Sequence, residues 1–313
     1  MFFFRTDGWP RMSSSSSSLA SLPTSSSRLL LLPRQSRRAA PPTAGDRTRT
    51  RNFFFASPRP DPAPPSRSRP GPPMGISKVT GTAAAVLLLT SLALHHTRLR
   101  LLAIPSLATA LVACAVTAAS HTAVNVPWIL GKSAATGRFP LWSFALFGPF
   151  LILARSYAMA KRFLRKKENV FDEIAQGLYL GGWPFLPAHL PPGGPSVVDC
   201  TCELPRSAFV DADEYLLVAT WDTRAPAIAQ IELAARWACE KRAQGKPVYV
   251  HCAFGHGRSA CVMCAILVAA GIAEDWKRAE EIIRGKRKIK MNAQHRKTLE
   301  DWSKSRVVQK KDN

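Results

Sequence analysis

Nine consecutive residues, His-Cys-Ala-Phe-Gly-His-Gly-Arg-Ser at positions 251–259, constrain the folding of this chain more than any other segment. An apolar run, Val248–Val250, precedes them, and a helix-forming stretch of small residues, Ser259–Ala270, follows. A strand, a tight loop and a helix N-terminus direct consecutive backbone N–H groups toward one point, which favours a bound anion. The segment therefore predicts a phosphate-sized site in an α/β fold. The residues expected to surround the phosphate are Ala253, Phe254, Gly255, His256, Gly257 and Arg258.

The side chains of this loop are those that hydrolysis of a phosphate ester through a cysteine requires. The loop amides and the helix end lower the pKa of Cys252, so that a thiolate, the competent nucleophile, exists near neutral pH. Arg258 would grip two phosphate oxygens and stabilise the charge of the transition state. Ser259 would donate a hydrogen bond to the sulfur and help it leave. The alternative is a buried structural cysteine beside an unrelated arginine.

The second part that this chemistry needs is an acid that protonates the leaving oxygen and then activates water. Asp222 is the leading candidate, because it follows a strand-like run, Tyr215–Thr220, and so lies at the carboxyl edge of the expected sheet. An aspartate before a helix can also serve only as a cap or turn residue. Three nearby acids precede the strand and are expected at the opposite end of it. They are Asp211, Asp213 and Glu214.

Residues 168–305 resemble the dual-specificity branch of the protein tyrosine phosphatase superfamily. The resemblance rests on five segments, which look like the first two strands, the general-acid position, the signature loop and the segment leading into the last helix. They are Ile174–Gly182, Val197–Thr201, Trp221-Asp222, His251–Ser259 and Ile289–Leu299, the last with Asn292 and Gln294.

The resemblance implies an α/β domain with a central, mainly parallel sheet flanked by helices. It implies that Cys252 is the nucleophile, Arg258 the phosphate clamp, Asp222 the general acid and Ser259 the helper of the leaving sulfur, without a metal or a cofactor. His251 would support the nucleophile from behind. Lipid-directed relatives often carry Lys or Arg inside the loop, whereas this loop holds only His256.

The expected substrate is a phosphoprotein carrying phosphotyrosine, phosphoserine or phosphothreonine. A phospholipid such as phosphatidylglycerophosphate or a phosphoinositide is the alternative. Two further interpretations belong to other classes, namely a rhodanese-like sulfur-transfer domain and a phosphate-binding module without turnover. The second would need a lost nucleophile, arginine or acid, and none is lost.

The net charge of +22 is distributed unevenly along the chain. Residues 1–167 hold 23 Lys and Arg against 3 Asp and Glu, whereas residues 168–313 hold 20 against 18. A groove for a nucleic-acid backbone would need the positive excess on the folded domain. No nucleic-acid partner is therefore expected.

Seven cysteines are present, and a thiolate nucleophile needs reducing surroundings. Cys200 and Cys202 together with Cys261 and Cys264 could be zinc ligands, but both pairs lie in apolar runs, which favours buried packing. A further hypothesis is that Cys200 or Cys202 forms a reversible disulfide with Cys252 and protects it from overoxidation.

Residues 1–73 are rich in Ser, Pro and Arg, with 12 Arg, no Lys and 3 acids. Such a composition predicts a disordered segment, and it is also typical of organelle transit peptides. The alternative is that Met74 is the true start of the chain, rather than Met1.

Residues 74–160 are predicted to be a membrane region of about three helices, with two as the fallback. The candidate spans are Val79–Leu94, Leu99–Ala119 and Phe139–Ala158. The basic run at 161–167 favours the cytosolic, reducing side for the folded domain, in a multi-pass membrane protein or in its organellar equivalent in a plastid or mitochondrion. With three spans, Arg98 and Arg100 agree with this orientation, but Lys132 and Arg138 would lie on the far side.

Within the folded domain the patterns predict four strands and four helices, followed by a tail at residues 306–313. The strands are expected at 177–181, 197–201, 215–220 and 247–251, and the helices at 227–244, 259–270, 275–284 and 293–305. The cluster Lys286-Arg287-Lys288 with Lys290 is expected to be a solvated surface, or else to contact headgroups or a phosphorylated substrate.

Overall fold

The structure, a computed structural model, describes residues 76–165 and 167–311, with side chains as far as Arg306. These residues belong to one compact unit, Ser66–Asn313. The leader predicted for residues 1–73 and the choice between Met1 and Met74 as the start lie outside the described residues.

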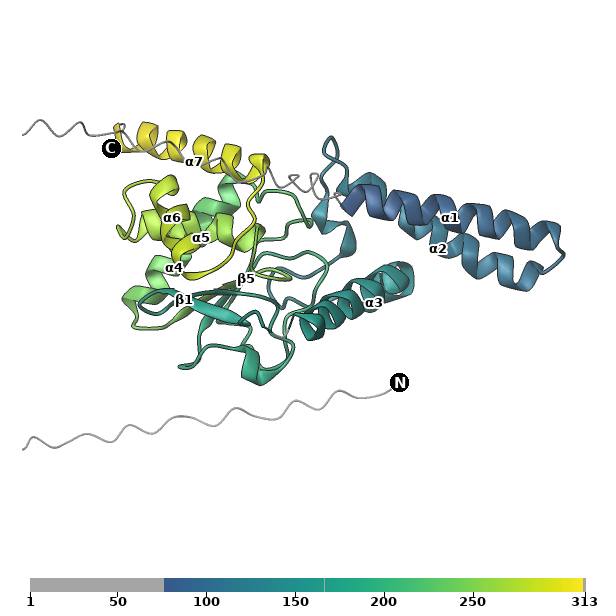
Figure 1. The fold of residues 1–313 in the computed structure, drawn as a ribbon, viewed down its shortest axis with the longest axis horizontal. Coiled ribbons are helices and arrows are strands. Elements are labelled where there is room, and N and C mark those ends of the chain that lie inside the picture. The colour runs from purple at the N-terminus through teal and green to yellow at the C-terminus, as the bar shows by residue number, and fades with distance from the viewer. Residues whose placement is uncertain (1–75, 166, 312–313) are drawn as a thin grey trace, which may run out of the picture. The chain divides into compact units, whose positions relative to one another are not determined.

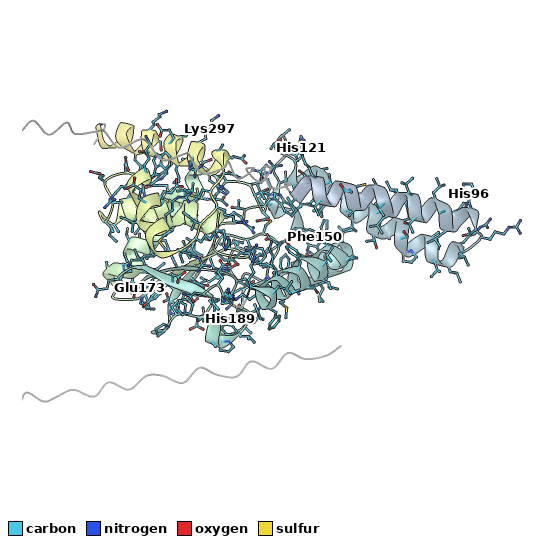
Figure 2. All side chains as sticks on the ribbon, in the orientation of Figure 1. His96, His121, Phe150, Glu173, His189 and Lys297 are labelled. Carbon is cyan, nitrogen blue, oxygen red and sulfur yellow. The ribbon has the colours of Figure 1, made fainter. Side chains whose placement is uncertain are left out.

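Two long apolar helices, α1 (Ile76–His96) and α2 (Arg100–Ser120), pair as a hairpin (Figure 1). Each has 21 residues, which is about 31 Å at about 1.5 Å per residue and enough for the hydrocarbon core of a bilayer. Hydroxyl groups link the two helices, as in Ser91 Oγ to Ala103 O at 3.0 Å. Apart from this pairing the side chains are mostly exposed; Figure 2 shows them standing out along both helices, with His96 at the hairpin end.

A third apolar helix, α3 (Leu141–Leu164), follows a connection that contains the short helix η1 (Pro127–Leu130). It is also long and apolar enough to cross a membrane, so the described residues hold three such helices, at the three predicted positions. More of α3 than of α1 or α2 is buried inside the protein.

A five-stranded sheet forms the centre of the remaining α/β domain, in the order β1-β2-β5-β3-β4. All neighbours run parallel except β1, which is antiparallel to β2. The predicted mainly parallel sheet is therefore confirmed. Its central strand, β5, leads directly into the cysteine-containing loop. The strands are β1 (Phe171–Ala175), β2 (Leu178–Gly181), β3 (Ser196–Asp199), β4 (Tyr215–Leu217) and β5 (Val248–His251).

The start of the domain differs from the prediction, because a hairpin stands where one strand was expected. Gly177 has φ +67° and turns the chain between β1 and β2, while its N–H donates to Glu173 Oε1 at 2.7 Å. Strand β4 is also shorter than predicted and ends at Leu217, so that the residues after it form a loop.

Helices pack on the sheet around α5, whose first ten residues are all buried. The main hydrophobic cluster joins residues of α4, α5, α6 and α7 to one face of β2, β3 and β5. A second, smaller cluster contains Val197 of β3, Tyr215 of β4 and Tyr249 of β5. The helices are α4 (Ile228–Ala243), α5 (Arg258–Ala269), α6 (Trp276–Lys286) and α7 (Ala293–Lys311), and a short helix, η2 (Pro187–His189), follows β2.

The connection between α2 and α3 packs into the α/β domain, which the sequence did not indicate. Lys132 is buried and its Nζ lies 2.6 Å from Asp199 Oδ2 at the end of β3. Tyr215 donates to the same oxygen at 2.9 Å, and Arg206 N donates to Gly137 O at 2.8 Å. Lys132 therefore supplies the cation that a buried carboxylate requires.

Candidate active site

The loop after β5, residues 252–257, is called the cysteine loop below, and its carbonyl groups are held from outside. Four consecutive carbonyl oxygens accept hydrogen bonds from groups around the loop, so the peptide dipoles direct their N–H ends inward. Gly255 has φ +76°, and a Cβ there would lie 2.6 Å from the backbone of Gly181. The carbonyl contacts are Trp183 N to Ala253 O (3.2 Å), Arg287 Nη2 to Phe254 O (3.0 Å), Arg287 Nε to Gly255 O (3.1 Å) and Lys290 N to His256 O (2.7 Å).

Cys252 lies buried at the base of this loop and accepts two hydrogen bonds on its sulfur. Gly255 N donates to Sγ at 3.3 Å, and Ser259 Oγ donates at 3.2 Å. Burial alone would raise the pKa of the thiol, but the charge of Arg258 and the hydrogen bonds from Ser259 and Phe254 outweigh it, so the pKa of Cys252 is lowered. At the other buried cysteines burial prevails over any nearby cation and raises the pKa of each. They are Cys200, Cys202, Cys261 and Cys264.

Arg258 is the first residue of α5 and is fully buried. Its Nη1 and Nη2 form a bidentate pair with Glu203, at 3.0 and 2.8 Å, and Nη1 also donates to Thr220 O at 2.7 Å. Burial lowers the pKa of Arg258, but Glu203, Asp222 and Cys252 raise it well above its ordinary value. The guanidinium plane is thus fixed from one edge. Its Nε is buried without a partner among the described residues and remains a free donor.

Glu203 is a residue of the site that the sequence analysis missed. It is buried in the loop that follows β3, next to Cys202, and no periodic pattern or family motif pointed to it. Its position shortly after a strand that neighbours β5 was the available signal, because the carboxyl ends of parallel strands meet at one edge of a sheet.

The loop after β4, residues 218–227, is called the aspartate loop below and brings Asp222 to the same edge. Asp222 Oδ1 lies 3.2 Å from Arg258 Nη2, and its side chain is about half exposed, at 51%. Asn292 Nδ2 donates to Thr223 O at 2.8 Å, and the backbone of Thr223 has φ +67°. The predicted residues Cys252, Arg258, Ser259 and Asp222 therefore lie together at one site.

The rival acids do not reach this site. Glu214 precedes β4, at the opposite end of the strand, and forms ion pairs with Lys241 and Lys246. These partners lower the pKa of Glu214 to about 2, although burial opposes them. Asp211 and Asp213 lie in the same segment before β4 and are exposed.

Comparison with known families identifies the domain. Residues 195–305 match the family model described as "Dual specificity phosphatase, catalytic domain". The α/β domain is a dual-specificity phosphatase domain. The chain thus carries a cysteine-based phosphatase, as the cysteine loop predicted. No curated protein matches the chain.

Solved structures that match this chain cover less than half of its length. PTPMT1 shares 22% sequence identity, over 46% of this chain and 99% of its own, with a TM-score of 0.39. A mouse putative dual specificity phosphatase complexed with zinc tungstate shares 21%, over 45% and 91%, with a TM-score of 0.40. Human DUSP28 shares 19%, over 44% and 94%, with a TM-score of 0.38.

The far side of the aspartate loop packs against the apolar helices. Trp221 is fully buried, and its ring lies edge-to-face on Phe150 of α3, with centroids 6.2 Å apart. Figure 2 marks Phe150 on this helix. Arg224 donates through Nε and Nη2 to Ser120 O, the last residue of α2, at 3.1 and 2.8 Å. Residues outside the phosphatase domain therefore hold the loop that carries Asp222.

The two histidines of the motif have partners other than the sulfur of the nucleophile. His251 Nε2 lies 3.9 Å from Asp199 Oδ1, and burial lowers the pKa of His251. His256 pairs with Glu168, and burial lowers its pKa as well. His251 thus supports β5 from behind, and His256 fastens the cysteine loop to the segment after α3.

Arg287 corrects the interpretation of the basic cluster as a solvated surface. Its side chain is buried, forms an ion pair with Asp172 at 2.6 Å, and donates to two carbonyls of the cysteine loop. Lys286, Lys288 and Lys290 are exposed, as expected for a charged surface. They line a groove next to His256, together with Arg165 and Lys167.

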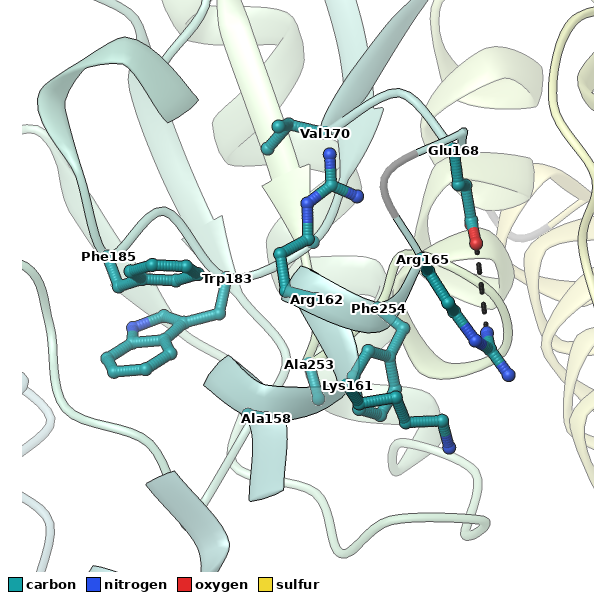
Figure 3. A pocket seen from close by; sticks show the side chains of 11 residues that line it. Ala158, Lys161, Arg162, Arg165, Glu168, Val170, Trp183, Phe185, Ala253 and Phe254 are labelled. Atoms are coloured by element: carbon teal, nitrogen blue, oxygen red, sulfur yellow. Dashed lines mark ion pairs between the residues drawn. The ribbon is translucent and has the colours of Figure 1, made fainter. Parts of the chain in front are cut away.

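A small pocket lies between the end of α3 and the cysteine loop, and residues of both line it (Figure 3). Lys161 Nζ lies 4.6 Å from the ring centroid of Phe254, and Tyr157 packs edge-to-face on the same ring. Trp183 and Phe185 line the opposite wall. Helix α3 therefore contacts the cysteine loop as well as the aspartate loop.

The hypothesis of a reversible disulfide stays a prediction. Cys200 N donates to His251 O at 2.8 Å, and Cys200 belongs to the same hydrophobic cluster as Cys252. Cys202 belongs instead to the cluster around Trp221. The packing favours Cys200 of the two candidates.

Proposed function

We propose that this chain hydrolyses phosphate monoesters without a metal ion, through a phosphocysteine at Cys252. The thiolate attacks phosphorus as the bond to the leaving oxygen breaks, and Asp222 as a carboxylic acid gives its proton to that oxygen. Water then attacks phosphorus and loses a proton to Asp222, while the sulfur–phosphorus bond breaks. Ser259 stabilises the departing thiolate through its hydrogen bond.

One observation carries the proposal, namely that Arg258 joins all the parts. Its guanidinium lies 3.2 Å from Asp222, it lowers the pKa of Cys252, and its Nε is left free. Glu203 holds the Nη1 and Nη2 edge of the guanidinium, so Nε is the donor left for a phosphate oxygen. The loop amides supply further donors for the charge that develops on the transferring group.

We propose further that the chain is attached to a membrane through its apolar helices and that its substrate is presented there. The basic groove of Arg165, Lys167, Lys286, Lys288 and Lys290 adjoins the cysteine loop, and α3 exposes apolar side chains beside it. Both features favour a phospholipid monoester, such as phosphatidylglycerophosphate or a monophosphorylated inositide. A phosphoprotein at the membrane is the second candidate, since the groove also suits an acidic peptide.

The test uses the full chain reconstituted in phosphatidylcholine vesicles, with Cys252→Ser as the inactive control. We expect phosphate release from phospholipid monoesters in the vesicles to exceed release from soluble phosphopeptides at equal phosphate concentration. A preference for the phosphopeptides would support the second candidate. Equal release by Cys252→Ser, or no release from any monoester, would contradict the phosphatase assignment itself.

A further inference from the structure

Helix α3 contacts the phosphatase domain along most of its length. Near its start, Ser143 Oγ donates to Leu130 O at 2.6 Å, in the connection that Lys132 and Arg206 fasten to the domain. In its middle, Phe150 packs on Trp221. Near its end, Phe163 packs on Phe185, with ring centroids 6.0 Å apart. Both ends of the helix therefore belong to the same side as the domain.

A helix that crosses a bilayer places its two ends on opposite sides. With 24 residues, α3 is about 36 Å long, so its length alone permits crossing. However, a bilayer around α3 would have to displace the domain from Phe150, Ala158 and Phe163. Helices α1 and α2 carry no such conflict, because most of their side chains are exposed.

The two faces of α3 differ in what they contact. Ser143, Phe147, Leu151 and Ala158 share one face and are buried. A second set of apolar side chains is largely exposed, with Leu141 at 87% and Leu164 at 85% at the two ends, although two of its members, Tyr157 and Phe163, also pack on aromatic rings of the domain. The other members of this set are Trp142, Leu146, Ile152, Leu153, Tyr157 and Phe163.

The charges of α3 also suit the surface of a bilayer better than its centre. Arg155 lies within the second half of the helix, and an arginine at the centre of a bilayer is costly. Its guanidinium lies over the rings of Phe139 and Phe144, at 5.6 and 5.0 Å from the centroids. The last turn carries Lys161 and Arg162, and Arg165 follows. These cations are complementary to anionic headgroups.

We infer that α3 lies in the plane of the membrane surface, with its exposed apolar side chains in the boundary between anionic headgroups and acyl chains. Only α1 and α2 cross the bilayer, as a hairpin that leaves from and returns to the side of the phosphatase domain. This inference rests on the membrane attachment proposed above. It places the cysteine loop, through its contacts with Tyr157 and Lys161, at the membrane surface.

The arrangement reverses the sidedness that three crossings would give. The turn at Arg98 then lies on the side opposite to the domain, and the connection with Lys132 and Arg138 lies on the same side. The conflict that Lys132 and Arg138 pose for three crossings disappears, since Lys132 is buried against Asp199 in the domain.

The first test is labelling of single introduced cysteines with a membrane-impermeant maleimide, in sealed vesicles that carry the full chain. Three exposed positions are compared, with the unsubstituted chain as background: Ala135→Cys in the connection, Ala212→Cys in the domain and Arg98→Cys in the hairpin turn. Before detergent is added, the labelled fraction should be equal for Ala135→Cys and Ala212→Cys. The labelled fraction for Arg98→Cys should equal the remainder, because this position faces the other side of the vesicle membrane. Labelling of Ala135→Cys on the side opposite to Ala212→Cys would overturn the inference.

The second test measures the depth of α3 with a nitroxide at Leu153→Cys, a position 66% exposed, in vesicles of phosphatidylcholine and phosphatidylglycerol. Collisions with oxygen should exceed those with a soluble nickel complex and place the label about 5–10 Å below the headgroups. A nitroxide at Ala212→Cys is the aqueous control. Three results would contradict the inference. They are a label at the bilayer centre, a label fully accessible to the nickel complex, and a label shielded from both probes by a protein partner.

Hydrolysis of a soluble aryl phosphate, measured on the same preparations, separates the two proposals. Its loss would count against the proposed phosphatase chemistry, whereas labelling and depth report on α3 without any turnover.

Discussion

The cysteine loop and the aspartate loop meet at Arg258 but are stabilised by different parts of the molecule. The cysteine loop is held mainly within the phosphatase domain, where Arg287, Trp183 and Lys290 bind its carbonyls. The aspartate loop is held largely from outside the domain, through Phe150 against Trp221 and through Ser120 O, which accepts from Arg224.

This difference separates two steps of the chemistry. Formation of the thiolate and binding of phosphate depend on groups inside the domain, whereas protonation of the leaving group depends on packing against α2 and α3. An excised fragment of residues 168–313 would lose Phe150, Ser120 and Lys132 together. Changes at the contacts of α2 and α3 with the aspartate loop, such as Phe150 on Trp221, should therefore slow the acid step and leave the nucleophile intact.

The largest expected effect follows from replacing the residue shared by both loops. Arg258→Lys keeps a positive charge but loses the fork that binds Glu203 and the free Nε. We expect kcat on an aryl phosphate to fall by about 10³-fold or more, the range measured for arginines that stabilise a transferring phosphoryl group. The matched control is Arg236→Lys, at an exposed ion pair of α4. A loss below tenfold would contradict the central place of Arg258.

The next effect should be confined to the acid step. Asp222→Asn should lower kcat by about 10²- to 10⁴-fold on an alkyl phosphate, which has a poor leaving group. The loss should be much smaller on an aryl phosphate, whose leaving oxygen needs little protonation. Alkylation of Cys252 by iodoacetamide should be unchanged. Equal losses on both substrates would show that Asp222 acts otherwise than as an acid.

A smaller effect of the same kind tests the packing of the aspartate loop on α3. Phe150→Ala removes the ring that supports Trp221, and we expect kcat on the alkyl phosphate to fall by about 10- to 10²-fold through misplacement of Asp222. Leu111→Ala, at an exposed position of α2, is the control and should have no effect. An unchanged rate for Phe150→Ala, or an equal loss of Cys252 alkylation, would break the distinction between the two loops.

The docking of the α2–α3 connection has a consequence for stability. Lys132→Met leaves the buried carboxylate of Asp199 without its cation and should cost about 3–5 kcal/mol of unfolding free energy, measured by denaturant titration in micelles. The double variant Lys132→Met/Asp199→Asn should recover much of this loss, because no buried charge remains. An undiminished stability in the single variant would show that the connection does not pack on the domain.

The pH dependence of stability follows from the same pair. Burial would raise the pKa of Asp199, but Lys132 and His251 lower it to about 2. A carboxyl whose folded pKa is depressed contributes stability above its unfolded pKa, near 3.9, and loses it as pH falls toward 2. In Lys132→Met the pKa should rise, so that the loss of stability should begin at a higher pH than in the natural chain.

The sequence predicted the parts of the site that are local. The strand, loop and helix around Cys252 and Arg258 are contiguous, and Asp222 follows a strand, so their meeting at one sheet edge could be inferred from the order of elements. The roles of Glu203 and Arg287 could not be identified, because each acts on a residue more than thirty positions away, and the basic cluster around Arg287 pointed instead to a solvated surface.

In the membrane region, too, the sequence predicted the local elements but not the contacts between distant residues. Hydropathy identified three helices correctly, but it does not distinguish an exposed apolar face from one packed on protein. The contact of Lys132, a lysine in the connection between α2 and α3, distinguishes these two cases. Its partner Asp199 lies 67 positions further along the chain.

Chemical trapping of the intermediate tests the account most directly. Ser259→Ala removes the hydrogen bond that stabilises the departing thiolate, at 3.2 Å in the structure, so hydrolysis of the intermediate should become slower than its formation. When the variant is mixed with an aryl phosphate and quenched in acid, peptide mass mapping should find phosphate bound to the sulfur of Cys252. Rapid release of phosphate without any adduct, or an adduct on another residue, would contradict the proposed mechanism.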